Sequence, residues 1–361
     1  MTTDELLSRL AKLGWESGLT RESLDAVADL PLRGDSFELA AITCELAIDN
    51  QPITVRGLFY RVVSAGFFPG TDDKFYNKFQ NLLVSLRRHR LIPYPWIVDN
   101  IRGTIRPNSW SGLEHFADTM KNVYRKHFWA ELPVYPHAFV EKDAMSGVLE
   151  PVTRELDVAL SPVRGYVSDS FAWSIGNQWK RIKDKRIVAI YIGDFDPSGF
   201  DLERSLREKL AEFSGLTIDT DDEVVVGPGK SDGDDFDAID WAIRIAGHPI
   251  PRDEGGASVT WKRIALNERD IADHGLHTMR LRRNKRTGKF ADTRAAKFFE
   301  RYGDQCCEVD ALPPGVIRER LRDEIMQHVP SDEWERLKEV EAIERETWEQ
   351  TIGTLRREGS R

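Results

Sequence analysis

The sequence predicts an α/β fold built on a parallel sheet, and three observations lead to this prediction. Residues 187–192 form a continuous apolar run rich in β-branched side chains, which is too short for a buried helix and typical of a strand buried on both faces. Residues 134–140 read as a second long strand. Between the two lie helical patterns at 144–160 and 170–182 and a short strand at 163–167, and this alternation is typical of a parallel sheet.

Carboxylates follow both long strands. Asp194 and Asp196 lie in the turn after residue 192, just before a helical pattern with leucines one turn apart, and Glu141 follows the strand at 134–140. Open α/β sheets bind ligands at the carboxyl ends of their strands. Carboxylates this close raise each other's pKa unless a cation lies between them, and Mg²⁺ binds through one or two carboxylates plus phosphate oxygens and water. The turn therefore predicts a Mg²⁺ site, with an acidic turn that only caps a helix as the alternative.

The order of these acids, a Glu after one strand and Asp-x-Asp after a later one, resembles the Toprim domain. The resemblance implies that Glu141, Asp194 and Asp196 hold the metal and that Glu141 also takes part in the chemistry. Haloacid-dehalogenase phosphatases also use Asp-x-Asp, but as a nucleophile motif near the start of the fold and without this Glu. We therefore favour the Toprim interpretation.

The whole chain has 361 residues, enough for two or three domains with substantial cores. No apolar run approaches the roughly 20 residues that span a bilayer, and the first residues lack the basic and apolar regions of a signal peptide. We therefore expect a cytoplasmic protein with no membrane contact. The three cysteines, two of them adjacent at Cys306 and Cys307, offer neither a zinc spacing nor a disulfide framework, and we expect them to be small buried side chains.

Changes in pattern divide the chain into four parts. Residues 1–50 read as a helical N-terminal extension, 51–110 as a winged-helix domain, 130–328 as the Toprim domain with further C-terminal elements, and 329–361 as a charged helix. The first part contains three helical patterns, at 4–13, 21–30 and 36–49. The final helix, at 331–357, carries an intermittent apolar stripe that we expect to pack on its own domain or on a copy of itself.

The winged-helix prediction depends on two helices and the segment that follows them. A helix at 55–65 ends at Gly66, and a second helix at 75–90 has one apolar face and a basic one. Residues 91–100 then provide a strand and a wing. Helix, turn, basic helix and wing is an arrangement that docks on double-stranded DNA, with the second helix in the groove.

Charge is unevenly distributed around the net value of −9. Residues 54–106 hold nine Lys or Arg against three acids, and residues 262–297 hold eleven against four. The compensating acid is concentrated at 219–240, with nine acids against Lys230. Two basic blocks are compatible with a groove that binds a polyanion, with solvated surface as the alternative for each block alone. We take eight basic residues as candidates for DNA contacts: Arg56, Lys78, Arg87, Arg88, Arg90, Lys285, Lys289 and Arg294.

A more specific resemblance begins at residues 55–60, Val-Arg-Gly-Leu-Phe-Tyr, which are similar to the catalytic segment of the topoisomerase VI A subunit and the related meiotic double-strand-break transesterase. In that family a winged-helix domain also precedes a Toprim domain. Residues 263–271 and 307–313 are similar to late motifs of the family, so the resemblance covers roughly residues 52 to 325. Tyr60 lies at the position of the tyrosine that attacks DNA, and Gly57 stands where the family usually has an acid.

Three functions follow as expectations. The resemblance implies Mg²⁺-dependent cleavage in which Tyr60 forms a covalent phosphotyrosyl link, in a homodimer whose sites are built from two chains. Strand passage would then require a separate ATPase subunit, because the chain has no phosphate-binding loop of its own. The first alternative is a Toprim nuclease that activates water, with Tyr60 packed in the helical domain. The second is a non-catalytic DNA-binding assembly protein.

Overall fold

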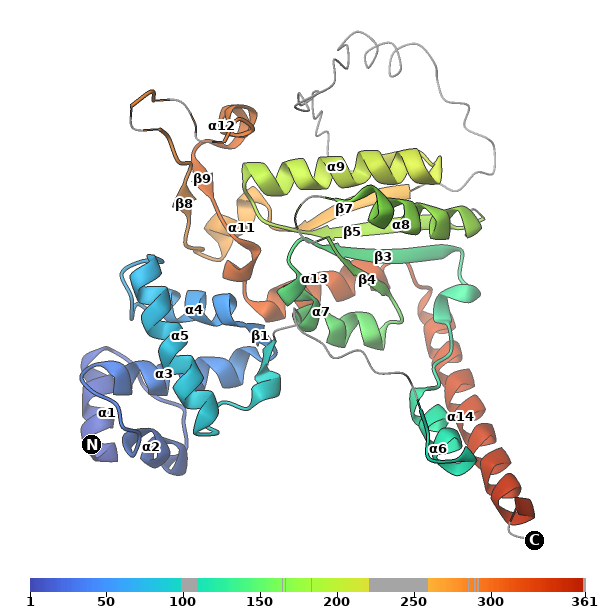
Figure 1. The fold of residues 1–361 in the computed structure, drawn as a ribbon, viewed down its shortest axis with the longest axis horizontal. Helices are drawn as coiled ribbons and strands as arrows, with labels where there is room; N and C mark the ends of the chain where they lie inside the picture. Colours follow the sequence, from blue (N-terminus) through green and yellow to red (C-terminus); the bar gives the residue numbers. More distant parts are fainter. Residues whose placement is uncertain are drawn as a thin grey trace.

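The computed structural model describes residues 1–98, 109–163, 165, 167–182, 184–220, 259–284, 286–288, 290 and 292–359. Within these residues the protein is a mixed α/β structure with 13 α-helices and a five-stranded parallel sheet (Figure 1). The predicted α/β class and parallel sheet are confirmed. No helix in these ranges is both long enough and apolar enough to cross a membrane.

The sheet has the strand order β4-β3-β5-β7-β6, and every neighbouring pair is parallel. Its members are β3 (Val134–Val140), β4 (Ala159–Pro162), β5 (Arg186–Ile192), β6 (Ile218–Thr220) and β7 (Val259–Ala265). The two long strands predicted from sequence are the adjacent strands β3 and β5. Their register pairs Val140 with Ile192, so both strands end at the same edge of the sheet.

Helices cover both faces of the sheet, as parallel strands require (Figure 1). Alternate residues of β3 and β5 pack against α8 (Asp169–Arg181) and α9 (Pro197–Ser214) on one face. The intervening residues face α7 (Asp143–Glu155) and α13 (Pro314–Met326) on the other. This two-sided burial explains why residues 187–192 are apolar without alternation.

Residues 1–98 form a helical region beside the sheet (Figure 1). Its helices are α1 (Thr3–Lys12), α2 (Arg21–Ala28), α3 (Ser36–Asn50), α4 (Val55–Ser64) and α5 (Asp73–Arg88). All five share one hydrophobic core, so the first 50 residues and the segment from 51 to 98 pack as a unit. The short strands β1 (Ile53–Thr54) and β2 (Ile97–Val98) pair in parallel at its border with the sheet region. The helices predicted here are confirmed to within about two residues.

Two sequence predictions are wrong in position. The strand expected at 163–167 lies earlier, at β4, because α7 ends at Glu155 and Asp157 then adopts a left-handed backbone with φ of 55°. Val163 and Val167 are nevertheless buried, against α8 and α9, which accounts for their strand-like composition. The strand expected at 91–100 is a 3₁₀ turn, Tyr94–Trp96, followed by the two residues of β2. The end of the predicted strand and wing, residues 99 and 100, lies outside the described ranges.

The remaining elements follow β7 and lead to the C-terminus. They are α11 (Glu268–Asp273), the antiparallel pair β8 (Met279–Arg280) and β9 (Gln305–Cys306), α12 (Ala295–Tyr302), the 3₁₀ turn η3 (Val309–Ala311) and α14 (Ser331–Gly359). The predicted C-terminal helix is confirmed as α14. Its first turns bury Trp334 and Leu337 in the core under the sheet, and its outer part runs beside α6 (Leu113–Val123), away from the body of the protein (Figure 1).

Candidate active site

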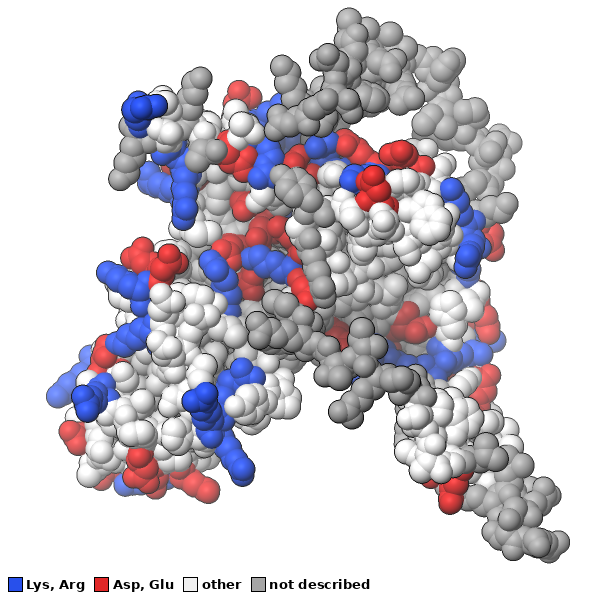
Figure 2. All heavy atoms as spheres, viewed as in Figure 1, with Lys and Arg blue, Asp and Glu red and all other residues white. Residues whose placement is uncertain are grey.

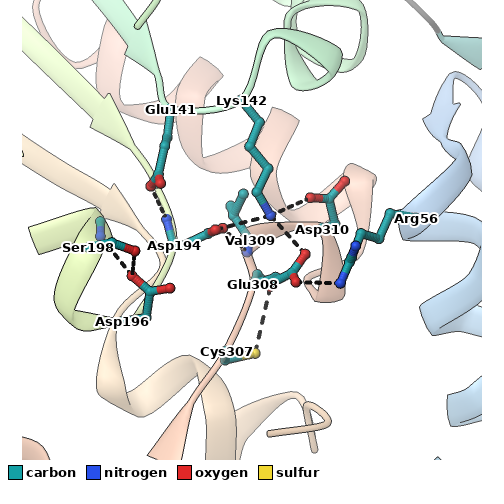
Figure 3. Close-up of polar contacts among 12 residues, drawn as sticks. Arg56, Glu141, Lys142, Asp194, Asp196, Ser198, Cys307, Glu308, Val309 and Asp310 are labelled. Carbon is teal, nitrogen blue, oxygen red and sulfur yellow. Dashed lines mark hydrogen bonds and ion pairs between the residues drawn. The ribbon is translucent and has the colours of Figure 1, made fainter. Parts of the chain in front are cut away.

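The predicted acids lie together at the edge where β3 and β5 end. Glu141 is the first residue after β3, and Asp194 and Asp196 lie in the turn between β5 and α9. The backbone N–H of Asp194 donates to Glu141 Oε2 at 2.7 Å, so the carboxylate of one strand end holds the turn that follows the other (Figure 3). The parallel register of the two strands brings this contact about.

Asp196 caps the helix that follows it. Its Oδ1 accepts hydrogen bonds from the backbone N–H of Gly199 and from Ser198 Oγ, both at 2.7 Å, and Pro197 occupies the first helical position. The acidic turn is therefore an N-cap, as the simpler interpretation of the sequence expected. Since both bonds use Oδ1, capping leaves Oδ2 for another ligand.

Two glycines allow the turn to pack closely on Glu141. A Cβ atom on Gly193 would lie 2.8 Å from Glu141 Oε2 and 2.6 Å from the ring of Tyr191. On Gly199 it would lie 2.6 Å from the carbonyl oxygen of Asp194. Side-chain atoms do not approach this closely without displacing something, so the position of the acids depends on glycine at both places.

A buried arginine supports the turn from beneath. Arg263, on β7, donates to the backbone carbonyl oxygens of Asp194 at 2.5 Å and Gly193 at 3.2 Å, and it pairs with Glu203 at 2.5 Å. Trp261 Nε1 holds the other oxygen of Glu203 at 2.8 Å. Sequence analysis placed Arg263 in a similar late motif but gave it no role. The structure shows that it fixes the backbone that carries the acids.

Three carboxylates converge on the ammonium of Lys142, the residue after Glu141. Its Nζ lies 3.0 Å from Asp194 Oδ2, 2.9 Å from Glu308 Oε2 and 2.9 Å from Asp310 Oδ2 (Figure 3). Sequence reasoning missed Lys142, although its position beside Glu141 was a possible signal. Glu308 and Asp310 lie in the segment 307–313, and sequence analysis assigned neither acid a role of its own.

The second oxygen of each of these carboxylates has a different donor. The backbone N–H of Val309 donates to Asp194 Oδ1 at 2.8 Å. Arg56, on α4, pairs with Glu308 Oε1 at 2.7 Å, and the hydroxyl of Thr54 donates to Asp310 Oδ1. The cluster therefore joins the strand ends, the segment after β9 and the helical region.

Burial and neighbouring charge shift the pKa values of this cluster. Burial raises the pKa of Asp194 to about 7, against the lowering effect of Lys142. Burial also raises the pKa of Glu141, and the charge of Asp196 adds to the rise. For Lys142, burial lowers the pKa, but Asp310, Asp194 and Glu308 together raise it well above its usual value. Lys142 is therefore charged at every physiological pH.

Tyr60 lies at the contact between the helical region and the sheet region. Its side chain is 2% exposed and belongs to the core that includes β3, β5 and α7. Burial raises the pKa of its hydroxyl to about 12, with Glu308 adding to the rise and Arg56 and Lys142 opposing it. The structure thus brings Tyr60 to the edge of the carboxylate cluster, but with a hydroxyl that is shielded and hard to ionise.

Helix α4 is docked tightly against η3 in this region. Thr54 caps α4 by accepting from the backbone N–H of Gly57 at 2.8 Å, and the guanidinium of Arg61 donates to the carbonyl oxygen of Ala311. A Cβ on Gly57 would lie 3.1 Å from Ile53 Cγ1 and from Thr54 Oγ1. This position has little room for a larger side chain, which gives a physical reason for the glycine.

The geometry bears on the metal prediction in two ways. Asp194 is committed to Lys142 and to the Val309 amide, and no group of three or more His, Cys, Asp or Glu within the described ranges is arranged to hold a metal ion. Glu141 and Asp196, in contrast, are half-buried and form no ion pair with a described Lys or Arg. Two carboxylates completed by phosphate oxygens and water match the way in which Mg²⁺ is usually bound.

The predicted DNA contacts on the helical region differ in whether another side chain already pairs with or stacks on them. Lys78 pairs with Asp35 at 2.6 Å, and the Arg87 guanidinium lies 4.3 Å from the centre of the Tyr94 ring. Arg88 and Arg90 are exposed and have no ion pair within residues 1–98, and Arg90 lies beyond the end of α5 with φ of 63°. Among the predicted contacts described in this region, Arg88 and Arg90 therefore present free positive charge.

Of the three remaining predicted contacts, Arg294 alone is among the described residues. Arg294 pairs with Asp292 at 2.7 Å and with Asp201 at 3.5 Å, and Lys285 and Lys289 lie outside the described residues. Figure 2 shows acidic side chains, with basic ones among them, in the hollow between the helical region and the sheet region. An anionic ligand that enters this hollow meets carboxylates and therefore needs cations beside it.

Two pockets among the described residues both lie away from this edge. The first, of about 370 Å³, is lined by Arg125, His127, Tyr135, Asp157 and other residues near the start of β3, at the opposite end of the strand from Glu141. The acidic edge is the better candidate, because its side chains are held by specific contacts.

No protein-family model, curated protein or solved structure matches this chain. The function is therefore inferred from the geometry of the site.

Proposed function

We propose that the protein cleaves DNA phosphodiester bonds by Mg²⁺-dependent hydrolysis at the edge formed by Glu141 and Asp196. The observation that supports this proposal is the contrast in charge pairing at that edge. Glu141 and Asp196 are half-buried and have no basic partner within the described residues, whereas the carboxylates beside them pair with Lys142. Unpaired carboxylates at the carboxyl ends of parallel strands are suited to a metal and its ligand.

In this proposal Glu141 and Asp196 hold the ion, which supplies Lewis-acid polarisation of the phosphate. Glu141 Oε2 is occupied by the Asp194 amide, which leaves Oε1 to take the proton of the attacking water. The water oxygen forms the new bond to phosphorus, one phosphorus–oxygen ester bond breaks, and the leaving oxygen takes up a proton.

Double-stranded DNA is the proposed substrate for two reasons. The exposed cations Arg88 and Arg90 lie at the end of α5 and just after it. Helices α4 and α5 form a helix–turn–helix segment that resembles a winged helix. The order of the acids on β3 and β5 resembles a Toprim domain. Both assignments belong to the proposal, as does the proposed Mg²⁺.

Cleavage by Tyr60 is a second candidate, favoured by a specific observation. Helix α4 packs on η3, which follows Glu308 directly, so Tyr60 borders the cluster that includes Asp194 and Lys142. Tyr60 is 2% exposed, so it could reach a phosphate only after α4 separates from η3. In this candidate the resemblance also implies a homodimer, and strand passage would require a separate ATPase subunit.

The test uses supercoiled plasmid and Mg²⁺, with nicked, linear and protein-linked DNA measured under denaturing conditions. We expect nicked or linear DNA with free ends, loss of cleavage when the metal is chelated, and a fall of about 10²- to 10⁴-fold in Glu141→Gln. Tyr60→Phe should cleave normally. Glu208→Gln, a change at an exposed acid on α9, is the matched control and should also cleave normally.

Each candidate has an outcome that would contradict it. A protein–DNA adduct that survives denaturant and disappears in Tyr60→Phe would replace hydrolysis with the second candidate. DNA binding without cleavage under any of these conditions would leave the non-catalytic alternative.

A further inference from the structure

We propose that Lys142 is a further residue of this site and that its ammonium contacts the phosphate being cleaved and neutralises part of its charge. The inference rests on the proposed DNA-cleaving function. It begins from the position of Lys142, which follows Glu141 directly and precedes the first turn of α7. Its backbone is extended, with φ of −99° and ψ of 124°, so the two adjacent side chains point to opposite sides.

Asp194 lies between these two side chains. Its backbone N–H contacts Glu141 and its carboxylate contacts Lys142, so the ammonium is separated from the proposed metal-binding pair by a single residue (Figure 3). Arg263 is also close to this turn, but its guanidinium binds backbone carbonyl oxygens and Glu203 beneath the sheet edge. Lys142 is therefore the cation whose side chain meets the Asp-x-Asp turn from the side of the cluster.

The carboxylates around Lys142 do not depend on it alone for their positions. Asp194, Glu308 and Asp310 each have a second oxygen held by Val309, Arg56 and Thr54 respectively. The side chain of Lys142 is also the most accessible of the four charged groups in the contact, at 27% exposed against 9% for Asp194, 15% for Glu308 and 3% for Asp310. The ammonium can thus leave while the carboxylates stay in place.

Charge gives the reason for that movement. Two cations, Lys142 and Arg56, against three carboxylates leave the cluster negative, and Glu141 and Asp196 add to the negative charge nearby. A phosphate that approaches this edge is repelled unless cations are available in addition to the metal. A lysine on its flexible four-carbon stem is a mobile point charge that can move from a carboxylate to a phosphate oxygen. Its charge would stabilise the transition state, in which negative charge on the phosphate oxygens increases.

The test compares two variants on two substrates, after the cleavage position of the wild type has been mapped on a short duplex. One substrate is the normal phosphodiester, and the other has an uncharged methylphosphonate at that position. On the phosphodiester we expect Lys142→Met to lower the cleavage rate constant by about 10²- to 10³-fold and Lys142→Arg, which keeps the charge, to lose at least about tenfold less. On the methylphosphonate Lys142→Met should lose much less activity relative to the wild type, since there is no charge to neutralise.

Two features keep the comparison decisive. The ratio of the two rates within one variant does not depend on how much of that variant is folded, so partial misfolding of Lys142→Met cannot imitate the effect. Lys209→Met removes an ammonium that pairs with Asp169 at 2.7 Å on the helices covering one face of the sheet, and we expect no change on either substrate.

The outcomes separate this inference from the proposed function. Equal rates for Lys142→Met and Lys142→Arg on the phosphodiester would overturn it, as would an equal loss by Lys142→Met on both substrates, which would show that Lys142 only holds the cluster together. If the wild type cleaves no DNA with Mg²⁺, the proposed function fails and this inference fails with it. Cleavage by the wild type together with an unimpaired Lys142→Met would remove the inference alone.

Discussion

The two ends of the carboxylate cluster differ in whether basic side chains pair with them. Glu141 and Asp196 accept hydrogen bonds from backbone N–H groups at the sheet edge, and no described Lys or Arg pairs with them. Asp310 is buried and Glu308 half-buried, and the two pair with Lys142, Arg56 and Thr54. The same kind of side chain therefore serves two purposes. In the proposed function the edge carboxylates keep their charge for a ligand, whereas those beside η3 join two regions of the protein.

The difference also accounts for the state of Tyr60. The contacts of Glu308 and Asp310 hold α4 against η3, and that docking covers the tyrosine. The edge carboxylates Glu141 and Asp196 are half-buried. A structure in which the helical region stays docked thus favours chemistry at the edge, and chemistry at Tyr60 requires the contacts beside η3 to break. Three changes test whether the edge and the docked side are independent in this way.

The largest effect is expected for Arg263→Met, which removes the support beneath the edge. The ion pair with Glu203 is almost fully buried, with side chains 6% and 8% exposed. Breaking a buried pair leaves one charge unpaired, and this costs about 3–5 kcal/mol of unfolding free energy. Urea denaturation would measure the loss. Arg322→Met, which breaks a pair with Glu155 whose side chains are 39% and 50% exposed, is the control and should cost less than about 1 kcal/mol.

Similar losses in the two arginine variants would mean that Arg263 is not what fixes the acid turn. The edge would then depend on the same docking contacts as the η3 side, and the contrast between the two ends of the cluster would disappear.

Features that depend on neighbouring residues could be predicted from the sequence, and features that depend on residues far apart in the chain could not. The strands β3 and β5 and the acids after them could be predicted, because apolar runs and turn residues are local signals. The partners of Lys142 could not, since Glu308 and Asp310 lie more than 160 residues away and reach it only through the fold. Burial of Tyr60 was foreseen only as an alternative, because a buried tyrosine and a nucleophile give the same pattern on an amphipathic helix. The early end of α7 was missed because the left-handed backbone at Asp157 has no reliable signal outside glycine.

A smaller effect is expected on the docked side for Thr54→Ala. Thr54 caps α4 and also donates to the buried carboxylate of Asp310, so the change removes a cap and leaves an acceptor without its partner. Together these losses should cost about 2–3 kcal/mol. Thr20→Ala removes a comparable cap, that of α2. The Thr20 hydroxyl otherwise contacts the exposed hydroxyl of Ser23 at 3.0 Å and no buried carboxylate among the described residues, so the change should cost about 1 kcal/mol.

The two threonine variants also separate docking from helix stability. We expect Thr54→Ala, but not Thr20→Ala, to make Tyr60 more accessible, which tyrosine-directed chemical modification followed by peptide mapping would detect. Equal stability losses and unchanged labelling would show that α4 does not rely on Asp310 for docking.

The smallest effect is expected for Gly199→Ala, and it returns to the edge. A Cβ at this position would lie 2.6 Å from the carbonyl oxygen of Asp194 and 3.0 Å from Glu141 Oε2, and the backbone atom can yield only if the acid turn shifts. We expect a loss of about 1–2 kcal/mol in unfolding free energy, the lower part of the range for overpacking. Gly315→Ala is the matched change in the first turn of another helix that begins with proline, α13, where no heavy atom would lie within 4 Å of the new Cβ. There the reduced freedom of the unfolded chain should stabilise the protein by about 0.5 kcal/mol. Changes of opposite sign in the free energy of unfolding, measured by urea denaturation, would place the constraint at the acid turn. Losses of equal size would show that both helices merely tolerate alanine poorly in their first turns.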